Sequence, residues 1–414
     1  MRIAVVNWTV RRVGGTETYL AGIVPALQRR GHETAFWHEV DRPADREVMR
    51  FSGDTPVWSA AALGANQALM ALQEWRPDVL YAHGLLDPDL EARTLDIAPA
   101  AFFAHAYYGV CISGSKAFSA PTRIPCDRPF GPACLLQFYP RRCGGLNPVT
   151  MGVEYVRQRA RLRLLTRYRA ILTHSEHMQR EYERYPGLEH RIHHSWYAAE
   201  PLGPPPPPLE EAPRSDDGTL GPLRLLFMGR MDDLKGGDLA IDAVPIVAST
   251  LRRFVHMVFA GDGPARGRWE AAAHETMTGG SGVRISFVGW QSGNELTHLL
   301  DSSDLLVVPS LWPEPYGRVG LEAGRRGVPT AAFAVGGIPE WLTAGRNGAL
   351  APADPPTAAG LAQAIVDCLI TPERHAGLRE GARAMAAHLD DVTRHLDLLE
   401  GILTRVAQGD VVSA

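Results

Sequence analysis

Five consecutive prolines, Pro204 to Pro208, divide the 414-residue chain near its middle. They lie in the segment 201–222, which also carries acidic pairs at 210–211 and 216–217. A segment of this composition cannot bury a core, and its prolines favour an extended polyproline II conformation. The sequence therefore predicts an interdomain linker over 201–222, with a folded domain on each side.

Both flanking parts repeat the same order, a short apolar strand, a turn with glycine and an amphipathic helix. In the first part we expect strands at Arg2–Asn7, Thr34–His38, Asp78–His83, Ala101–His105, Ala170–His174 and near 191–194. In the second part we expect them at Leu223–Met228, His256–Ala260, Arg284–Val288, Asp304–Val308 and Pro329–Phe333. This alternation predicts an α/β protein with two doubly wound domains and parallel sheets. We place these domains at 1–200 and 223–385, with a C-terminal helix over 386–414 that packs back on the first domain.

Composition excludes several classes of protein. Lys and Arg total 42 against 46 Asp and Glu, so the net charge of −4 argues against a nucleic-acid partner. The sequence has no apolar run long enough for a membrane span, and its N-terminal apolar stretch is too short for a signal peptide. Five cysteines fit a reducing compartment. We therefore expect a cytoplasmic protein.

The most informative motif runs from Ser310 to Ala323, directly after a predicted strand. Pro313 and Pro315 flank Glu314 and hold it in a stiff, non-helical turn, while Gly317 allows the chain to pass close to a ligand. Glu322 lies one to two turns into the following helix, where its carboxylate could accept two hydrogen bonds from a cis-diol. Ligands of doubly wound sheets bind outside the carboxyl ends of the strands, so this loop is a candidate binding site.

A second motif combines Gly229-Arg230 with Lys235-Gly236-Gly237, again between a strand and a helix. A planar guanidinium and a compact ammonium at such a turn suit a diphosphate. Fixed cations there would also stabilise negative charge that develops on such a group. The alternative is two solvated cations, since Asp232 and Asp233 could pair with them locally.

Two features of the first part are weaker. Gly14-Gly15 follows the first strand and lets the backbone approach a ligand at a helix N-terminus, although a plain tight turn explains it equally well. His105 ends a predicted strand, where a histidine can serve in proton transfer. His83 and His174 also end strands, with less reason for a role.

Taken together, these motifs resemble the retaining glycosyltransferases of family 4, which have the GT-B fold. The resemblance rests on the Glu-x7-Glu pair, Glu314 and Glu322, and on Gly336-Gly337-Ile338-Pro339-Glu340 after the next strand. It covers most of the chain and is best over about 223–350. It implies two Rossmann-like domains that face a central cleft, with the donor bound mainly by the second domain and the acceptor by the first.

The resemblance also implies individual roles. Glu314 would hold hydroxyls of the donor sugar, Glu322 the nucleotide ribose, and His105 would lie near the anomeric region. The implied catalytic residues are His105, Arg230, Lys235 and Glu314. The implied donor-binding residues are Gly14, Gly15, Arg230, Lys235, Glu314, Tyr316, Gly317, Glu322, Gly336 and Gly337. Since Arg230 and Lys235 can neutralise the diphosphate, no catalytic metal and no cofactor are required beyond the nucleotide sugar.

Four of the five cysteines, Cys111, Cys126, Cys134 and Cys143, lie in an expected insert over about 108–150. Their spacings do not match paired Cys-x-x-Cys zinc modules. A structural zinc or iron–sulfur site and loose cytosolic thiols both remain open.

The stretch Tyr155–His174 carries Arg157, Arg159, Arg161, Arg163, Arg167 and Arg169 without an acidic residue. It predicts a basic amphipathic helix with Val156, Ala160, Leu164 and Tyr168 on one face. Such a helix can rest weakly on the inner face of a membrane, or it can be a solvated basic surface.

The sequence thus predicts a retaining transfer of a sugar from a nucleoside-diphosphate sugar, UDP or GDP, to an acceptor. The acceptor could be a small molecule, a lipid or a glycan. A nucleotide-sugar epimerase with the same fold and a catalytically silent nucleotide-sugar-binding partner are the alternatives.

Overall fold

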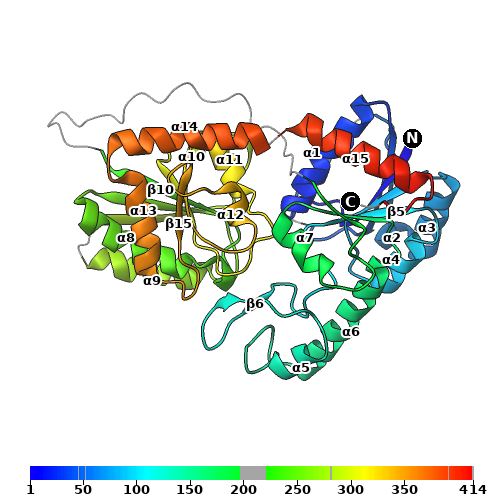
Figure 1. Ribbon diagram of the computed structural model, residues 1–414, viewed down its shortest axis with the longest axis horizontal. Coiled ribbons are helices and arrows are strands. Elements are labelled where there is room, and N and C mark those ends of the chain that lie inside the picture. Colours follow the sequence, from blue (N-terminus) through cyan, green and yellow to red (C-terminus); the bar gives the residue numbers. More distant parts are fainter. Residues whose placement is uncertain (45, 52, 196–220, 280–281, 390, 413–414) are drawn as a thin grey trace. The chain divides into compact units, whose positions relative to one another are not determined.

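The computed structural model describes residues 1–44, 46–51, 53–195, 221–279, 282–389 and 391–412 (Figure 1). It divides into two compact units. The N unit comprises the described residues of Met1–Lys116, Asp127–Glu200 and Asp390–Ala414, and the C unit those of Ala117–Cys126 and Pro201–Leu389. Most of the expected linker lies outside the described residues.

The N unit contains a parallel seven-stranded sheet. Its strands in spatial order are β3 (Val57–Ser59), β2 (Glu33–Val40), β1 (Arg2–Thr9), β4 (Val79–Ala82), β5 (Ala100–Ala104), β8 (Ala170–Thr173) and β9 (Ile192–His194). The central strands are continuous runs of buried residues, as expected for strands covered on both faces. Strand order changes direction between β1 and β4, which pair through Ile3 and Val79.

The C unit repeats this plan with six parallel strands. They are, in spatial order, β12 (Val283–Gly289), β11 (Val255–Ala260), β10 (Leu223–Met228), β13 (Leu305–Val308), β14 (Thr330–Phe333) and β15 (Gly348–Ala351). Here the direction changes between β10 and β13. Both sheets have the order of doubly wound Rossmann domains, which confirms the predicted fold class.

Helices connect the strands in both units (Figure 1). Those of the N unit are α1 (Gly15–Arg29), α2 (Ala60–Leu63), α3 (Ala65–Glu74), α4 (Pro88–Thr94), α5 (Ala133–Gln137), α6 (Pro148–Leu165), α7 (Glu176–Glu183) and α15 (Val392–Ala407). Those of the C unit are the 3-10 turn η1 (Asp233–Lys235), α8 (Gly237–Leu251), α9 (Arg266–Thr278), α10 (Gly293–Asp301), α11 (Val319–Arg325), α12 (Ile338–Trp341), α13 (Ala358–Leu369) and α14 (Pro372–Leu389). Among the described residues, none of these helices has the length and apolar character needed to cross a membrane.

The expected strands are present, with ends shifted by at most two residues. β3 and β15 were not expected, nor was the short antiparallel pair β6 (Ala117–Phe118) and β7 (Ile124–Pro125). The helix expected over Tyr155–His174 is wrong in its second half, because α6 ends at Leu165 and the chain then enters β8. Its expected apolar face is also wrong, since Val156 is exposed while Leu164 is buried.

Candidate functional site

In the C unit, the loops after β10 and β13 leave adjacent strands at the point where strand order changes direction. They bring Lys235 and Glu314 together, with 2.6 Å between Nζ and Oε1. The side chain of Lys235 is 23% exposed and that of Glu314 is 8% exposed. The hydroxyl of Ser310 donates to the same carboxylate oxygen at 2.5 Å. The resulting ion pair lies where doubly wound sheets bind their ligands.

Two glycines allow the close backbone contacts on which this arrangement depends. Gly236 has φ +65°, and a Cβ there would lie 2.0 Å from the carbonyl oxygen of Pro309. Gly336 has φ +56°, and its Cβ would lie 2.2 Å from the carbonyl oxygen of Glu314. The amide of Gly337 donates to that same carbonyl oxygen at 2.8 Å. These glycines are therefore required by close backbone contacts inside the unit.

The next part of the motif is held by Trp341 of α12. Its indole donates to the carbonyl oxygen of Tyr316 at 2.6 Å, and both residues are buried. Gly317 has φ +88°, and Gly320 leaves the space that the Trp341 ring fills, since a Cβ there would lie 2.0 Å from the ring. Tyr316 and Gly317 thus lie in a rigid turn that leads into α11.

The other two predicted donor-site side chains, Glu322 and Arg230, form ion pairs of their own. Glu322, in the first turn of α11, pairs with Arg318 at 3.1 Å. Arg230 is 71% exposed, and its Nε lies 3.9 Å from Asp232. The local Arg230–Asp232 pairing considered from the sequence is thus present, with long and solvent-exposed geometry.

In the N unit, Gly14 precedes α1 and Gly15 begins it. Gly14 has an extended backbone, and a Cβ there would meet only Glu17 Oε2, at an ordinary 3.9 Å. Neither conformation nor packing inside the unit requires glycine at this position. Gly14 follows the carboxyl end of β1, next to β4, where this sheet also changes direction.

Glu17 lies in the first turn of α1, directly after the Gly14–Gly15 loop. Only 3% of it is exposed, and its carboxylate accepts from the Gly14 amide at 2.9 Å and the Trp8 indole at 3.1 Å. The Asn7 amide adds a longer bond of 3.4 Å. Burial raises the pKa of Glu17 above its ordinary value, although these hydrogen bonds act in the opposite direction.

His105 follows β5 and belongs to a histidine cluster. Its Nε2 lies 2.8 Å from Nδ1 of His83, which follows β4, and its ring centroid lies 4.8 Å from that of His174, which follows β8. Burial, together with charge repulsion from His174, lowers the pKa of His83 to about 3. His83 is therefore neutral at physiological pH. A single proton lies between its Nδ1 and the Nε2 of His105 in their hydrogen bond.

Beside this cluster, α15 contributes a buried histidine that the sequence did not reveal. His395 Nε2 lies 2.7 Å from the hydroxyl of Tyr19 in α1, and the Tyr19 hydroxyl lies 2.7 Å from that of Tyr81 in β4. His395 Nδ1 lies 2.7 Å from the hydroxyl of Ser195. No sequence signal could have paired His395 with Tyr19, because 376 positions separate them.

The cysteine insert holds no metal site in the described part of the chain. No group of three or more His, Cys, Asp or Glu side chains is arranged there to bind a metal ion. All five cysteines are free thiols, and Cys126 belongs to the C unit whereas Cys111, Cys134 and Cys143 belong to the N unit. The structural zinc or iron–sulfur site considered above is therefore not formed by the described residues.

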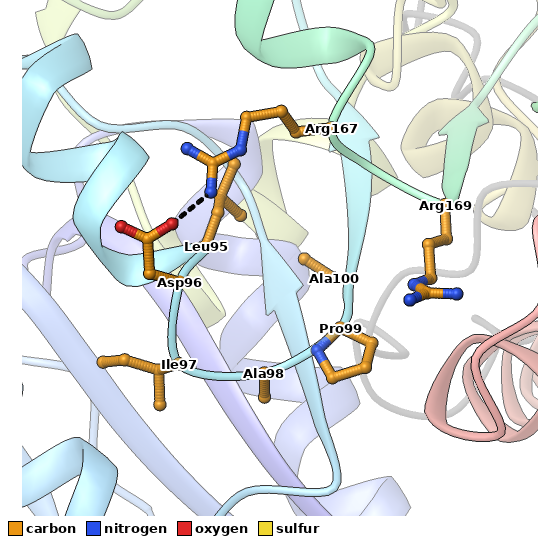
Figure 2. A pocket seen from close by; sticks show the side chains of 8 residues that line it. All are labelled: Leu95, Asp96, Ile97, Ala98, Pro99, Ala100, Arg167 and Arg169. Atoms are coloured by element: carbon orange, nitrogen blue, oxygen red, sulfur yellow. Dashed lines mark hydrogen bonds and ion pairs between the residues drawn. The ribbon is translucent and has the colours of Figure 1, made fainter.

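A shallow pocket of about 470 Å³ lies elsewhere, at the amino ends of β5 and β8. Figure 2 shows its lining, with Arg167 paired to Asp96 at 2.6 Å and Arg169 on the opposite wall. None of the predicted site residues lines this pocket. The predicted residues of the same unit, Gly14, Gly15 and His105, follow the carboxyl ends of strands instead.

Two family models match the chain. One, described as Glycosyltransferase Family 4, matches residues 13–194, and one described as Glycosyl transferases group 1 matches residues 222–370. A glycogen synthase of Mycobacterium tuberculosis is 34% identical over 173 residues, which cover 41% of this chain and 38% of that protein. A 2-deoxystreptamine glucosyltransferase of Streptomyces kanamyceticus is 37% identical over 112 residues, which cover 27% of this chain and 28% of that protein. The chain thus spans well under half the length of these curated relatives.

Among solved structures, HepE of Anabaena in complex with UDP and glucose has a TM-score of 0.68 at 18% identity. The alignment covers 98% of this chain and all of that one. At this identity the likeness shows the fold, which is the GT-B fold expected from the sequence. Since the two family models together account for most of the chain and the fold agrees with them, the chain belongs to the glycosyltransferases of family 4 type.

Proposed function

We propose that this protein transfers a sugar from a nucleoside-diphosphate sugar to an acceptor, with retention at the anomeric carbon. The observation that carries the proposal is the Lys235–Glu314 ion pair at the point where the C-unit sheet changes direction. It places a cation suited to a diphosphate next to a carboxylate suited to sugar hydroxyls. The alternative of two solvated cations does not account for a lysine held against a buried glutamate.

In the proposed mechanism, Lys235 and the exposed Arg230 bind the diphosphate and stabilise the charge that develops as it leaves. Glu314 holds donor-sugar hydroxyls, and Glu322 holds the ribose. Main-chain groups of Tyr316, Gly317, Gly336 and Gly337 complete the donor site.

The N unit supplies the Gly14–Gly15 loop and His105. The bond between the anomeric carbon and the diphosphate oxygen breaks, and a bond to an acceptor oxygen forms on the same face. The acceptor proton passes to the leaving diphosphate, so neither a carboxylate base nor a metal ion is needed.

UDP and GDP are the proposed nucleotides of the donor. The structure of HepE was solved with UDP, which favours UDP for this chain by analogy. The acceptor is a small molecule, a lipid or a glycan, and we propose a cytoplasmic location.

The first test measures the binding of UDP, GDP, ADP and dTDP by thermal shift and calorimetry. A nucleotide held at 100 times its Kd stabilises the protein by about 2.7 kcal/mol. We expect one clear binder among the four, and binding of none would contradict the proposal. Incubating the corresponding nucleotide sugar without acceptor separates the alternatives, because an epimerase would change the sugar and a silent partner would leave it intact even with acceptors present.

We also propose a weak contact between α6 and an anionic membrane surface. Val149, Val153 and Val156 are 69%, 47% and 67% exposed, and Arg159 and Arg163 are exposed further along the helix. Exposed apolar groups with neighbouring cations suit such a surface. We expect more protein to co-sediment with phosphatidylserine-containing vesicles than with neutral ones, and less after Val153→Asp with Val156→Asp. Equal sedimentation with both vesicle types would argue for a merely solvated basic face.

A further inference from the structure

The first turn of α1 contains a buried carboxylate that the mechanism above does not use. We propose that Glu17 is a positioning residue for the transfer reaction, because it fixes the Gly14–Gly15 loop and the Trp8 ring together through hydrogen bonds. This inference rests on the proposed function, in which that loop contacts the substrates.

The contacts of Glu17 tie three parts of the site to one group. Oε2 accepts from the Gly14 amide at 2.9 Å, and Oε1 accepts from the Trp8 indole at 3.1 Å. The Asn7 amide, which reaches Oε1 at 3.4 Å, is itself fixed by donating to the carbonyl oxygen of Thr9 at 2.7 Å. The loop and the end of β1 are thereby held as one rigid piece.

All of these partners are donors, so both carboxylate oxygens must act as acceptors. A glutamine at position 17 would have nearly the same shape, but its NH2 group would face either the Gly14 amide or the Trp8 indole. Two donors that face each other cannot form a hydrogen bond, and a buried unmatched donor is unfavourable. The negative charge, and not only the size of the side chain, is therefore required to hold the loop.

The negative charge of the ionised Glu17 carboxylate lowers the free energy of unfolding relative to the protonated form. Because burial raises the pKa of Glu17, its contribution to the free energy of unfolding is greatest at low pH and declines as pH rises above the ordinary value of 4.5. The groups that face the carboxylate, Asn7, Trp8 and Gly14, do not titrate in this range.

In the described part of the unit nothing requires glycine at position 14, because a Cβ there would meet only Glu17 Oε2, at an ordinary 3.9 Å. In the proposed function, a substrate at this loop would meet a backbone whose position Glu17 determines. A shift of about 1 Å at such a contact can lower a rate by about a hundredfold.

The test compares wild type with Glu17→Gln, Glu17→Asp and Trp8→Phe, which keeps the aromatic ring and removes the indole N–H. Glu33→Gln is the matched control, since Glu33 is an exposed glutamate at the opposite end of the sheet. For each protein we would measure kcat, KM for acceptor and donor, nucleotide affinity, and hydrogen exchange of the peptide over residues 8–20.

We expect Glu17→Gln to lower kcat/KM for the acceptor by about tenfold to a hundredfold, with nucleotide affinity reduced much less, because most of the proposed nucleotide contacts come from the C unit. Glu17→Asp should recover part of the loss. Trp8→Phe should also lower kcat/KM for the acceptor. In the double variant Glu17→Gln with Trp8→Phe, the factor by which kcat/KM falls should be smaller than the product of the two single factors. Hydrogen exchange at Gly14 should accelerate in Glu17→Gln and stay slow in Glu33→Gln.

Near-wild-type kinetics and exchange in Glu17→Gln would overturn the inference. A Glu17→Gln protein with accelerated hydrogen exchange throughout the N unit, and not only over residues 8–20, would show general unfolding and would also overturn it. If the wild-type protein bound no nucleotide and transferred no sugar, the proposed function itself would have failed, which is a separate outcome.

Discussion

Replacing Lys235 by alanine is expected to lower kcat/KM for transfer by about two to three orders of magnitude. The variant loses the cation that we place on the leaving diphosphate. It also leaves the largely buried Glu314 carboxylate with Ser310 but without its charged partner at 2.6 Å. Steady-state kinetics with the nucleotide sugar identified by the binding screen would measure the loss, and nucleotide affinity should fall in parallel.

Two variants control for charge and for folding. Arg268→Ala removes a neighbouring cation that pairs with Asp233 of η1 on the exposed surface, and it should leave kcat/KM close to wild type. Lys235→Arg keeps the charge but replaces a compact ammonium by a planar fork, so it should recover only part of the activity. Equal losses in Arg268→Ala and Lys235→Ala would show that net charge, and not the position of Lys235, determines the rate.

Gly336→Ala is expected to destabilise the C unit by about 3 kcal/mol. The new methyl group would lie 2.2 Å from the carbonyl oxygen of Glu314 and 2.5 Å from its amide nitrogen. Both are backbone atoms, which cannot move aside as the end of a flexible side chain can. Moving them would displace Glu314 from Lys235, so activity should fall together with the midpoint of urea unfolding.

Gly345→Ala separates the clash from the backbone conformation. Gly345 also has a positive φ, +78°, but a Cβ there would meet no atom within 4 Å. It should therefore show only the smaller penalty of a left-handed alanine, about 1 kcal/mol. If both variants lost the same stability, the close packing of Gly336 against the Glu314 loop would be of no consequence.

The sequence predicted those site residues that combine a charged side chain with a position just after a strand. Lys235 and Glu314 each follow a recognisable apolar strand, and parallel strands bring their carboxyl ends to one edge. The ion pair itself, across 79 positions, required the strand order of the folded sheet. The sequence also did not predict that Trp341 donates to the Tyr316 carbonyl oxygen. A hydrogen bond between an indole and a carbonyl group leaves no pattern in sequence.

Other predictions failed for identifiable physical reasons. β3 and β15 are only three and four residues long, and the Gly-Ala-Leu-Ala of β15 has no strong β-branched or aromatic signal. The arginines expected on one basic face are partly used inside the fold, since Arg161 donates to the carbonyl oxygens of Leu85 and Leu86. Arginine spacing alone does not distinguish such internal anchors from a solvated surface.

The hydrogen bonds of His395 have a consequence for biosynthesis. The N unit is discontinuous in sequence, and α15 supplies the partner of Tyr19 and Ser195 only after the ribosome has passed residue 389. Apart from the short segment 117–126, the described residues of the C unit come from a single stretch of the chain that ends at Leu389. Domains generally fold as units while the chain emerges. In the half of the molecule that is translated first, Tyr19 and Ser195 therefore lack this partner until the half translated second has been made.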